Sequence, residues 1–188
     1  MSTVLIIVLI VVVVIAAAAA VVLLGPGRGR AGGGSLKRRF GPEYERVLAR
    51  HDGDSGAAER ELGERVKRYG DFRPRPLPQE RHESYVALWA GVQEQFVDSP
   101  QKAVAEADRL LSAVAVERGY PDGESEQIEA LSVHHGPVVD GFRRVRRAAR
   151  GEGGTEEMRE AVVEARALFE ALVADPRAQT LHAKRSGV

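Results

Sequence analysis

Cysteine is absent from this chain of 188 residues, which excludes a disulfide framework and thiolate chemistry. Any zinc site would therefore have to be built from histidine and carboxylate ligands alone. An excess of one charge is missing as well, because 27 basic residues cancel 27 acidic ones. No global positive field favours a polyanion, so we expect no nucleic-acid partner.

Catalytic signatures are also missing. No histidine has glutamate three residues before it or a second histidine four residues away, which excludes the helical di-metal and zincin patterns. The pair His134 and His135 falls in a predicted turn over 132–136, where adjacent side chains diverge, so we interpret it as a loop or cap feature. His82 lies among charged residues at the predicted start of a helix, which favours a solvated side chain. We predict no catalytic residue, no cofactor and no metal site.

The most informative feature that is present is an uninterrupted apolar run, Val4–Leu24. Its 21 residues include sixteen Val, Ile or Leu and contain no polar side chain, Gly or Pro. A helix of this length, rising ~1.5 Å per residue, covers roughly 30 Å, the thickness of the hydrocarbon core of a bilayer. We predict a transmembrane helix at 1–24. The chain is then a single-pass protein of the cell membrane, with the lipid bilayer as its first partner.

A cleaved secretory signal is the alternative interpretation of this run. Such signals have an apolar region of ~7–15 residues behind a positively charged start. Here the apolar region is longer, and only Met1–Thr3 precede it, so the α-amine supplies its N-terminal charge. The stretch Ala16–Ala20 nevertheless offers small-residue cleavage positions. Cleavage there would make the remainder a secreted helical domain.

Five cations follow the run before the first acidic residue, Glu43. Because Lys and Arg beside a membrane span favour the cytoplasmic side, we predict the N-terminus outside and the helical domain in the cytoplasm. The same side chains are candidate contacts for anionic lipid headgroups, at about 1 kcal/mol each near the surface, although a purely topological role also accounts for them. They are Arg28, Arg30, Lys37, Arg38 and Arg39.

Composition divides the rest of the chain into three parts. Residues 25–35 read GPGRGRAGGGS and are predicted to form a flexible linker, since they contain nothing to bury. Residues 36–175 are long enough to enclose a modest core and are predicted to form one α-helical domain. Residues 176–188 are predicted to be a disordered tail.

The predicted fold class is all-α: the N-terminal transmembrane helix, the linker, and an irregular bundle of about five to six helices. Apolar residues recur at helical spacing and no strand pattern occurs. Trp89 is the expected core anchor, Ser99 and Thr155 are expected N-caps, and Pro42 and Pro100 are expected first-turn residues. The predicted helices run from Pro42 to about His51, from Asp54 or Ser55 to Gly70, from Pro78 or Gln79 to Val97, from Pro100 to Gly119, from Pro137 to Arg150 and from Thr155 to the residue before Asp175, with a weaker segment at 128–131.

One predicted helix carries an arginine-rich face. Arg143, Arg146, Arg147 and Arg150 lie three, four and seven residues apart, so they share a side of the helix. They are candidate contacts for an acidic partner, and anionic lipid or nucleic acid would meet the same charge. Internal pairing with the many glutamates of the domain is the competing interpretation, and we prefer it.

Several stretches together are similar to a family of uncharacterised actinobacterial proteins, often labelled membrane or secreted, with one N-terminal span and a helical body. The stretches are LKRRFGPEYERVL at 36–48, AERELGERV at 58–66, FVDSPQKAVAEADRLLSAV at 96–114 and RGYP at 118–121. Members of that family read closer to LSVDHP where this chain has LSVHHGP at 131–137. The resemblance implies the same architecture and carries no catalytic motif.

Taken together, these features predict a membrane-anchored helical interaction module that binds a protein partner or associates with itself. A lipid-binding or small-molecule-binding bundle is the alternative, with its pocket near Tyr85, Trp89 and Phe169. An enzyme with a carboxylate site assembled from distant residues is the third and least favoured hypothesis.

Overall fold

The computed structural model describes residues 30–174, so the predicted transmembrane helix at 1–24 and the predicted tail at 176–188 lie outside the described residues. Over residues 30–174 the chain is all-α, with eight helices and no strand, which is more helices than the five to six predicted. None of these helices is both long enough and apolar enough to cross a bilayer. They are α2 (Arg30–Phe40), α3 (Pro42–Arg50), α4 (Ser55–Tyr69), α5 (Gln79–Asp98), α6 (Pro100–Glu117), α7 (Glu124–His135), α8 (Val139–Ala149) and α9 (Thr155–Val173).

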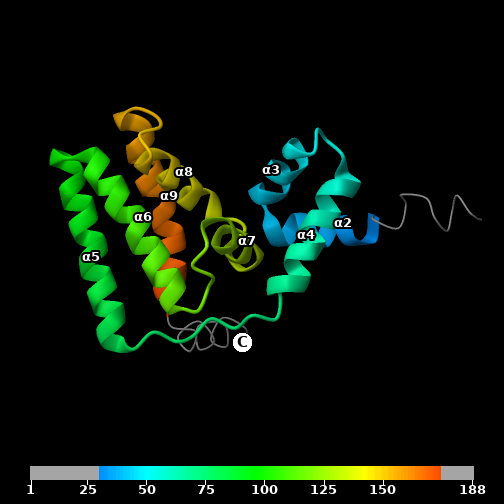
Figure 1. Cartoon of the computed structure of the whole chain (residues 1–188), viewed down its shortest axis with the longest axis horizontal. Coiled ribbons are helices and arrows are strands. Elements are labelled where there is room, and N and C mark those ends of the chain that lie inside the picture. The colour runs from blue at the N-terminus through cyan, green and yellow to red at the C-terminus, as the bar shows by residue number, and fades with distance from the viewer. Residues whose placement is uncertain (1–29, 175–188) are drawn as a thin grey trace, which may run out of the picture.

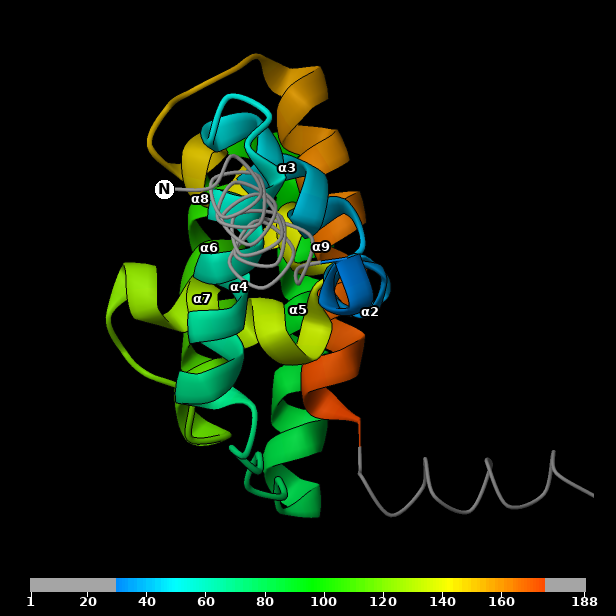
Figure 2. The same ribbon diagram turned by 90° about the vertical axis from the view of Figure 1, so that its right-hand side faces the viewer.

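The helices form two groups joined by α7 (Figure 1). The larger group is a bundle of α5, α6, α8 and α9, in which α8 packs most extensively on α9 and α5 packs on α6. The smaller group consists of α2, α3 and α4 and has its own core around Phe40, Val47 and Leu62. In Figure 1, α2 and α5 lie at opposite ends of the molecule. Figure 2 shows the same arrangement from the side of the smaller group.

Several predicted helix starts are confirmed. Pro42 and Pro100 occupy the first turns of α3 and α6, where a missing N–H removes no helical bond. The Asp54 carboxylate caps α4 by accepting a hydrogen bond from the Ala57 N–H at 3.0 Å. Ser99 occupies the N-cap position of α6, as predicted, but its side chain makes no capping hydrogen bond. Thr155 is the first helical residue of α9 and the cap lies one position earlier.

The predicted linker over 25–35 is wrong in its second half, because α2 begins at Arg30. Glycine is a poor helix former, at about 1 kcal/mol per residue relative to alanine, so local propensity alone predicts no helix here. Packing opposes that preference. Phe40 is fully buried in the core of the smaller group and Leu36 packs against the same cluster.

The predicted turn over 132–136 is also wrong, since α7 continues to His135. Its apolar periodicity is weak because two of its buried positions are polar, Gln127 and Ser132. Both have internal partners. The Gln127 amide donates to the Pro121 carbonyl at 3.0 Å, and the Ser132 hydroxyl donates to the Glu129 carbonyl at 2.7 Å.

Trp89 anchors the bundle core, as predicted. Its ring stacks on Phe169 of α9 with centroids 4.6 Å apart and planes 11° apart. Leu88, the apolar residue just before Trp89, is half exposed and lies outside this core. In α6 the apolar residues that recur at helical spacing are all buried: Val104, Ala107, Leu110, Leu111 and Val114.

We predict that the free energy of unfolding depends on pH because of the His135 imidazole. Burial lowers the pKa of His135 to about 4, and its Nε2 lies 3.1 Å from the Tyr120 hydroxyl. Because this pKa lies below the unfolded value of ~6.5, folding favours the neutral ring. The free energy of unfolding therefore falls as pH drops below ~6.5, by about 1–2 kcal/mol between pH 7 and pH 5 from this group. Urea unfolding of H135Q should show a correspondingly shallower loss, and parallel pH profiles would contradict the assignment.

Candidate functional site

The arginine face predicted on residues 137–150 does not exist as one exposed surface. Arg143 turns inward, with only a fifth of its side chain exposed, and donates to the Glu43 carboxylate of α3 at 2.5 Å. Arg146 is 8% exposed and lies inside the bundle. Arg150 pairs with Glu124 at the start of α7. Arg147 is exposed and makes no ion pair within residues 34–174. The internal-pairing interpretation therefore describes three of the four side chains.

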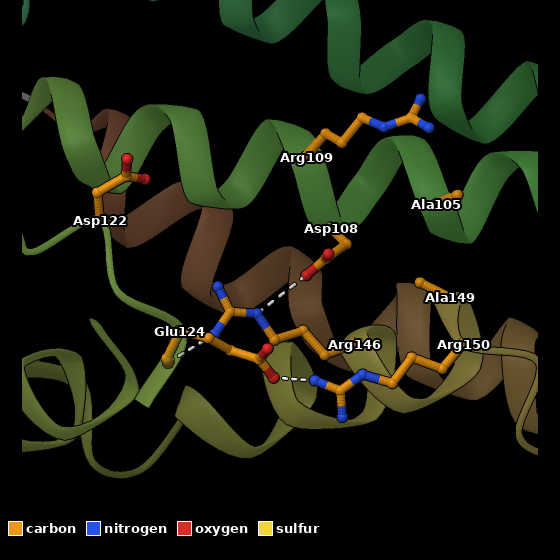
Figure 3. Close-up of a pocket in the computed structure, with 8 residues that line it drawn as sticks. All are labelled: Ala105, Asp108, Arg109, Asp122, Glu124, Arg146, Ala149 and Arg150. Atoms are coloured by element: carbon orange, nitrogen blue, oxygen red, sulfur yellow. Dashed lines mark hydrogen bonds and ion pairs between the residues drawn. The ribbon is translucent and has the colours of Figure 1, made fainter. Parts of the chain in front are cut away.

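Arg146 is the most fully bonded of these groups. Its Nε donates to the Asp108 carboxylate at 3.1 Å, and its terminal nitrogens donate to the Glu124 carbonyl at 2.8 Å and the Gln127 amide oxygen at 2.7 Å. Figure 3 shows Arg146 between Asp108 and Glu124, and Arg150 against the Glu124 carboxylate; all four residues line a polar pocket of about 330 Å³. Since carboxylates of the same domain already neutralise these cations, the pocket offers little attraction to an acidic ligand.

The candidate lipid contacts are only partly available. Lys37 pairs with Glu45 at 2.6 Å, and the Arg39 Nε donates to the Val133 carbonyl at 3.1 Å. Arg38 is exposed, without an ion pair to the described side chains. Arg28 and the side chain of Arg30 lie outside the described residues. Of the three described cations, Arg38 is the one that is exposed to solvent without an ion pair or a hydrogen bond to a described residue.

The adjacent histidines have structural partners. The His134 Nε2 lies 2.8 Å from the Tyr69 carbonyl, an acceptor, so this nitrogen donates and holds the end of α4 against α7. His135 bonds to Tyr120 as described above. No group of three metal-ligating side chains occurs in the part of the chain that the structure describes.

A different feature, the groove between α5 and α9, is the strongest candidate site. The two helices run side by side in opposite directions (Figures 1 and 2). The cavity between them measures about 440 Å³, with the stacked rings of Trp89 and Phe169 among its lining residues. Its α5 wall includes Val86, which is 44% exposed, and Ala90. Its α9 wall includes Val173.

The two walls of this groove differ in charge. On α9, Arg166 and Glu170 neutralise each other across 2.7 Å. On α5, Glu83 and Glu94 lie three or four residues from Val86 and Ala90, so they flank the apolar stripe. Both carboxylates are exposed, and neither forms an ion pair with a side chain that the structure describes; Glu83 accepts one hydrogen bond, from the Gln79 amide at 2.7 Å. The α5 wall therefore attracts cations.

Two polar atoms in residues that line the groove lack hydrogen-bond partners among the described residues. They are Nε1 of Trp89 and Nδ1 of His82, and both are buried. A buried polar group without a partner costs about 1–3 kcal/mol, so the groove is not optimised for stability alone.

Sequence reasoning located this site only in part. Trp89 and Phe169 do line the groove, as the predicted pocket required. Tyr85 does not, because its hydroxyl donates to Glu117 of α6 at 2.5 Å. The exposed wall was missed, although a signal was present. Val86, Ala90 and Val97 follow helical spacing and form a second small-apolar stripe beside the buried one.

Comparison with known protein families, curated proteins and solved structures finds no match to this chain. The resemblance to actinobacterial single-span proteins therefore stays a prediction.

Proposed function

We propose that this chain is a membrane-anchored helical module whose α5–α9 groove binds a basic amphipathic helix of a protein partner. The observation that carries the proposal is the asymmetry of the groove. An apolar floor is bordered by exposed apolar residues and, on one side only, by Glu83 and Glu94, whose carboxylates form no ion pair with described residues. A helix with an apolar stripe and cations along one edge matches both features, as in other helix-in-groove complexes.

The position of the groove favours a protein partner over a lipid. If Val4–Leu24 spans the membrane, residues 25–29 are all that separates it from the start of α2. Five residues reach at most ~18 Å when fully extended, so α2 would stay at the membrane surface with Arg38 near the headgroups. Because α5 lies at the opposite end of the molecule from α2 (Figure 1), we infer that the groove wall formed by α5 is distant from the anchored end of the domain. The same orientation puts the domain in the cytoplasm if the flanking cations set topology.

Site-specific photocrosslinking of the full chain in intact cells tests this proposal. Benzoylphenylalanine at Gln93, a groove residue, should attach reproducibly to one protein segment whose sequence combines an apolar stripe with Lys or Arg. The same group at Ser84 is the matched control. Ser84 is also an exposed residue of α5, and nine residues, or two and a half turns, place it on the opposite side of the helix.

A second change makes the test specific to charge and shape. A90R adds bulk and a cation to the groove, so it should abolish the Gln93 adduct while leaving the fold intact, because Ala90 is exposed. An adduct of equal yield from Ser84, or an attached segment that lacks basic residues, would overturn the proposal.

A small-molecule or lipid ligand is the second candidate for the same groove. Its volume of about 440 Å³ lies within the range of ~300–1,000 Å³ typical of ligand sites. The unpaired Nε1 of Trp89 and Nδ1 of His82 are polar groups of the kind that orient a ligand. In the crosslinking experiment this candidate predicts attachment to a lipid or metabolite at Gln93 and to no protein.

A further inference from the structure

We propose that residues 175–188 of the same chain bind in the α5–α9 groove and compete with the partner. This inference rests on the proposed function, and it adds an autoinhibitory occupant to it. The first observation in its support is the place where the chain leaves α9. Ala174, the residue after α9, itself lines the groove.

The exit geometry directs the chain out of the helix at the groove. Ala174 has φ −58° and ψ 136°, an extended conformation that ends α9. The Arg118 guanidinium donates to the Ala174 carbonyl at 3.4 Å, which fixes this point to α6. Leu181 follows seven residues later, a maximum reach of ~25 Å. The eight residues of α9 from Arg166 to Val173 span only ~10 Å from first to last, so Leu181 can reach any position along this wall.

The chemistry of residues 175–188 matches that of the groove. Their apolar side chains include Leu181, with alanines three residues before and two after it. They carry three cations, Arg177, Lys184 and Arg185, against the single carboxylate of Asp175. This basic, weakly apolar segment is complementary to the α5 wall, where Glu83 and Glu94 form no ion pair with described residues.

Tethering makes even weak binding effective. A short flexible connection gives an effective concentration of about 1 mM at the site. A segment with an intrinsic Kd of about 0.1 mM would then fill roughly nine-tenths of the grooves, and the apparent affinity for a competing partner would fall about tenfold.

Disulfide trapping tests the contact directly, because the chain has no cysteine of its own. In the full chain, the pair A90C and L181C should form an intramolecular disulfide under mild oxidation, identified by peptide mass. The pair S84C and L181C is the control and should not, since Ser84 lies on the far side of α5. Equal trapping of both pairs, or a disulfide that links two chains, would overturn the intramolecular proposal.

A binding measurement separates this inference from the proposed function. The probe is a fluorescent 14-residue Leu–Lys amphipathic helix, and the protein is the full chain in phosphatidylcholine nanodiscs. Stopping the chain after Ala174 should tighten probe binding about tenfold, and L181Q should do the same, while T180Q, which leaves the charge and Leu181 unchanged, should not. If the probe binds with one affinity to all four proteins, the autoinhibition fails but the groove function stands. If A90R leaves probe binding unchanged, the groove function fails, and the autoinhibition with it.

Discussion

E43Q is expected to lower the free energy of unfolding by about 3–5 kcal/mol, the range measured when one partner of a buried ion pair is removed. The Glu43 side chain is 1% exposed and accepts from two guanidinium groups, Arg65 at 2.8 Å and Arg143 at 2.5 Å. Glutamine keeps the size and removes the charge. It leaves the buried Arg65 with Glu61 as its remaining carboxylate and Arg143 with none at bonding distance, so the join between α3, α4 and α8 loses its central anion.

A matched control lies two residues away on the same helix. Glu45 pairs with Lys37, but both side chains are more than half exposed. Exposed pairs of this kind contribute about 0–1 kcal/mol, so E45Q should lower the free energy of unfolding by no more than about 1 kcal/mol. Urea unfolding of the full chain, followed by the fluorescence of Trp89, the single tryptophan, measures both variants. A loss below 1 kcal/mol for E43Q would show that water reaches the Glu43 site.

The sequence predicted the parts of this fold that depend on local chemistry. Helix starts at Pro42, Asp54 and Pro100 follow from caps and fixed backbone angles, which act within one turn. The helical spacing of apolar residues is also a local property, and in α6 and α9 it coincides with the buried face of each helix. The helix at Arg30 and the full length of α7 were missed because tertiary packing stabilises them against weak or polar local patterns.

The candidate site was harder to predict because it depends on which helices are neighbours. Trp89 and Phe169 are eighty residues apart, and no spacing rule indicates that their rings stack. The arginines of α8 illustrate the opposite error. Their spacing on one face was correct, but Arg143 and Arg146 project into carboxylates from α3 and α6 that the sequence could not place beside them.

Helix neighbours also explain the second large effect, which is expected at Gly141 in α8. A Cβ atom at this position would lie 2.5 Å from the Ala165 nitrogen and 2.6 Å from the Glu164 carbonyl carbon, both backbone atoms of α9. The backbone of a packed helix cannot yield as a flexible side chain can, so α8 and α9 must separate. We expect G141A to lower the free energy of unfolding by about 1–3 kcal/mol, the usual range for overpacking.

In the control variant the free energy of unfolding is expected to change in the opposite direction. Gly91 lies in α5, and a Cβ there would meet nothing within 4 Å. Alanine reduces the entropy of the unfolded chain and favours the helix, so G91A should raise the free energy of unfolding by about 0.5–1 kcal/mol. Urea unfolding of the two variants compares one substitution in two environments. If both stabilise the protein, α8 and α9 do not approach as closely as Gly141 and Ala165 indicate. The α5–α9 groove would then lose its fixed wall, because α8 is the helix against which α9 packs most extensively.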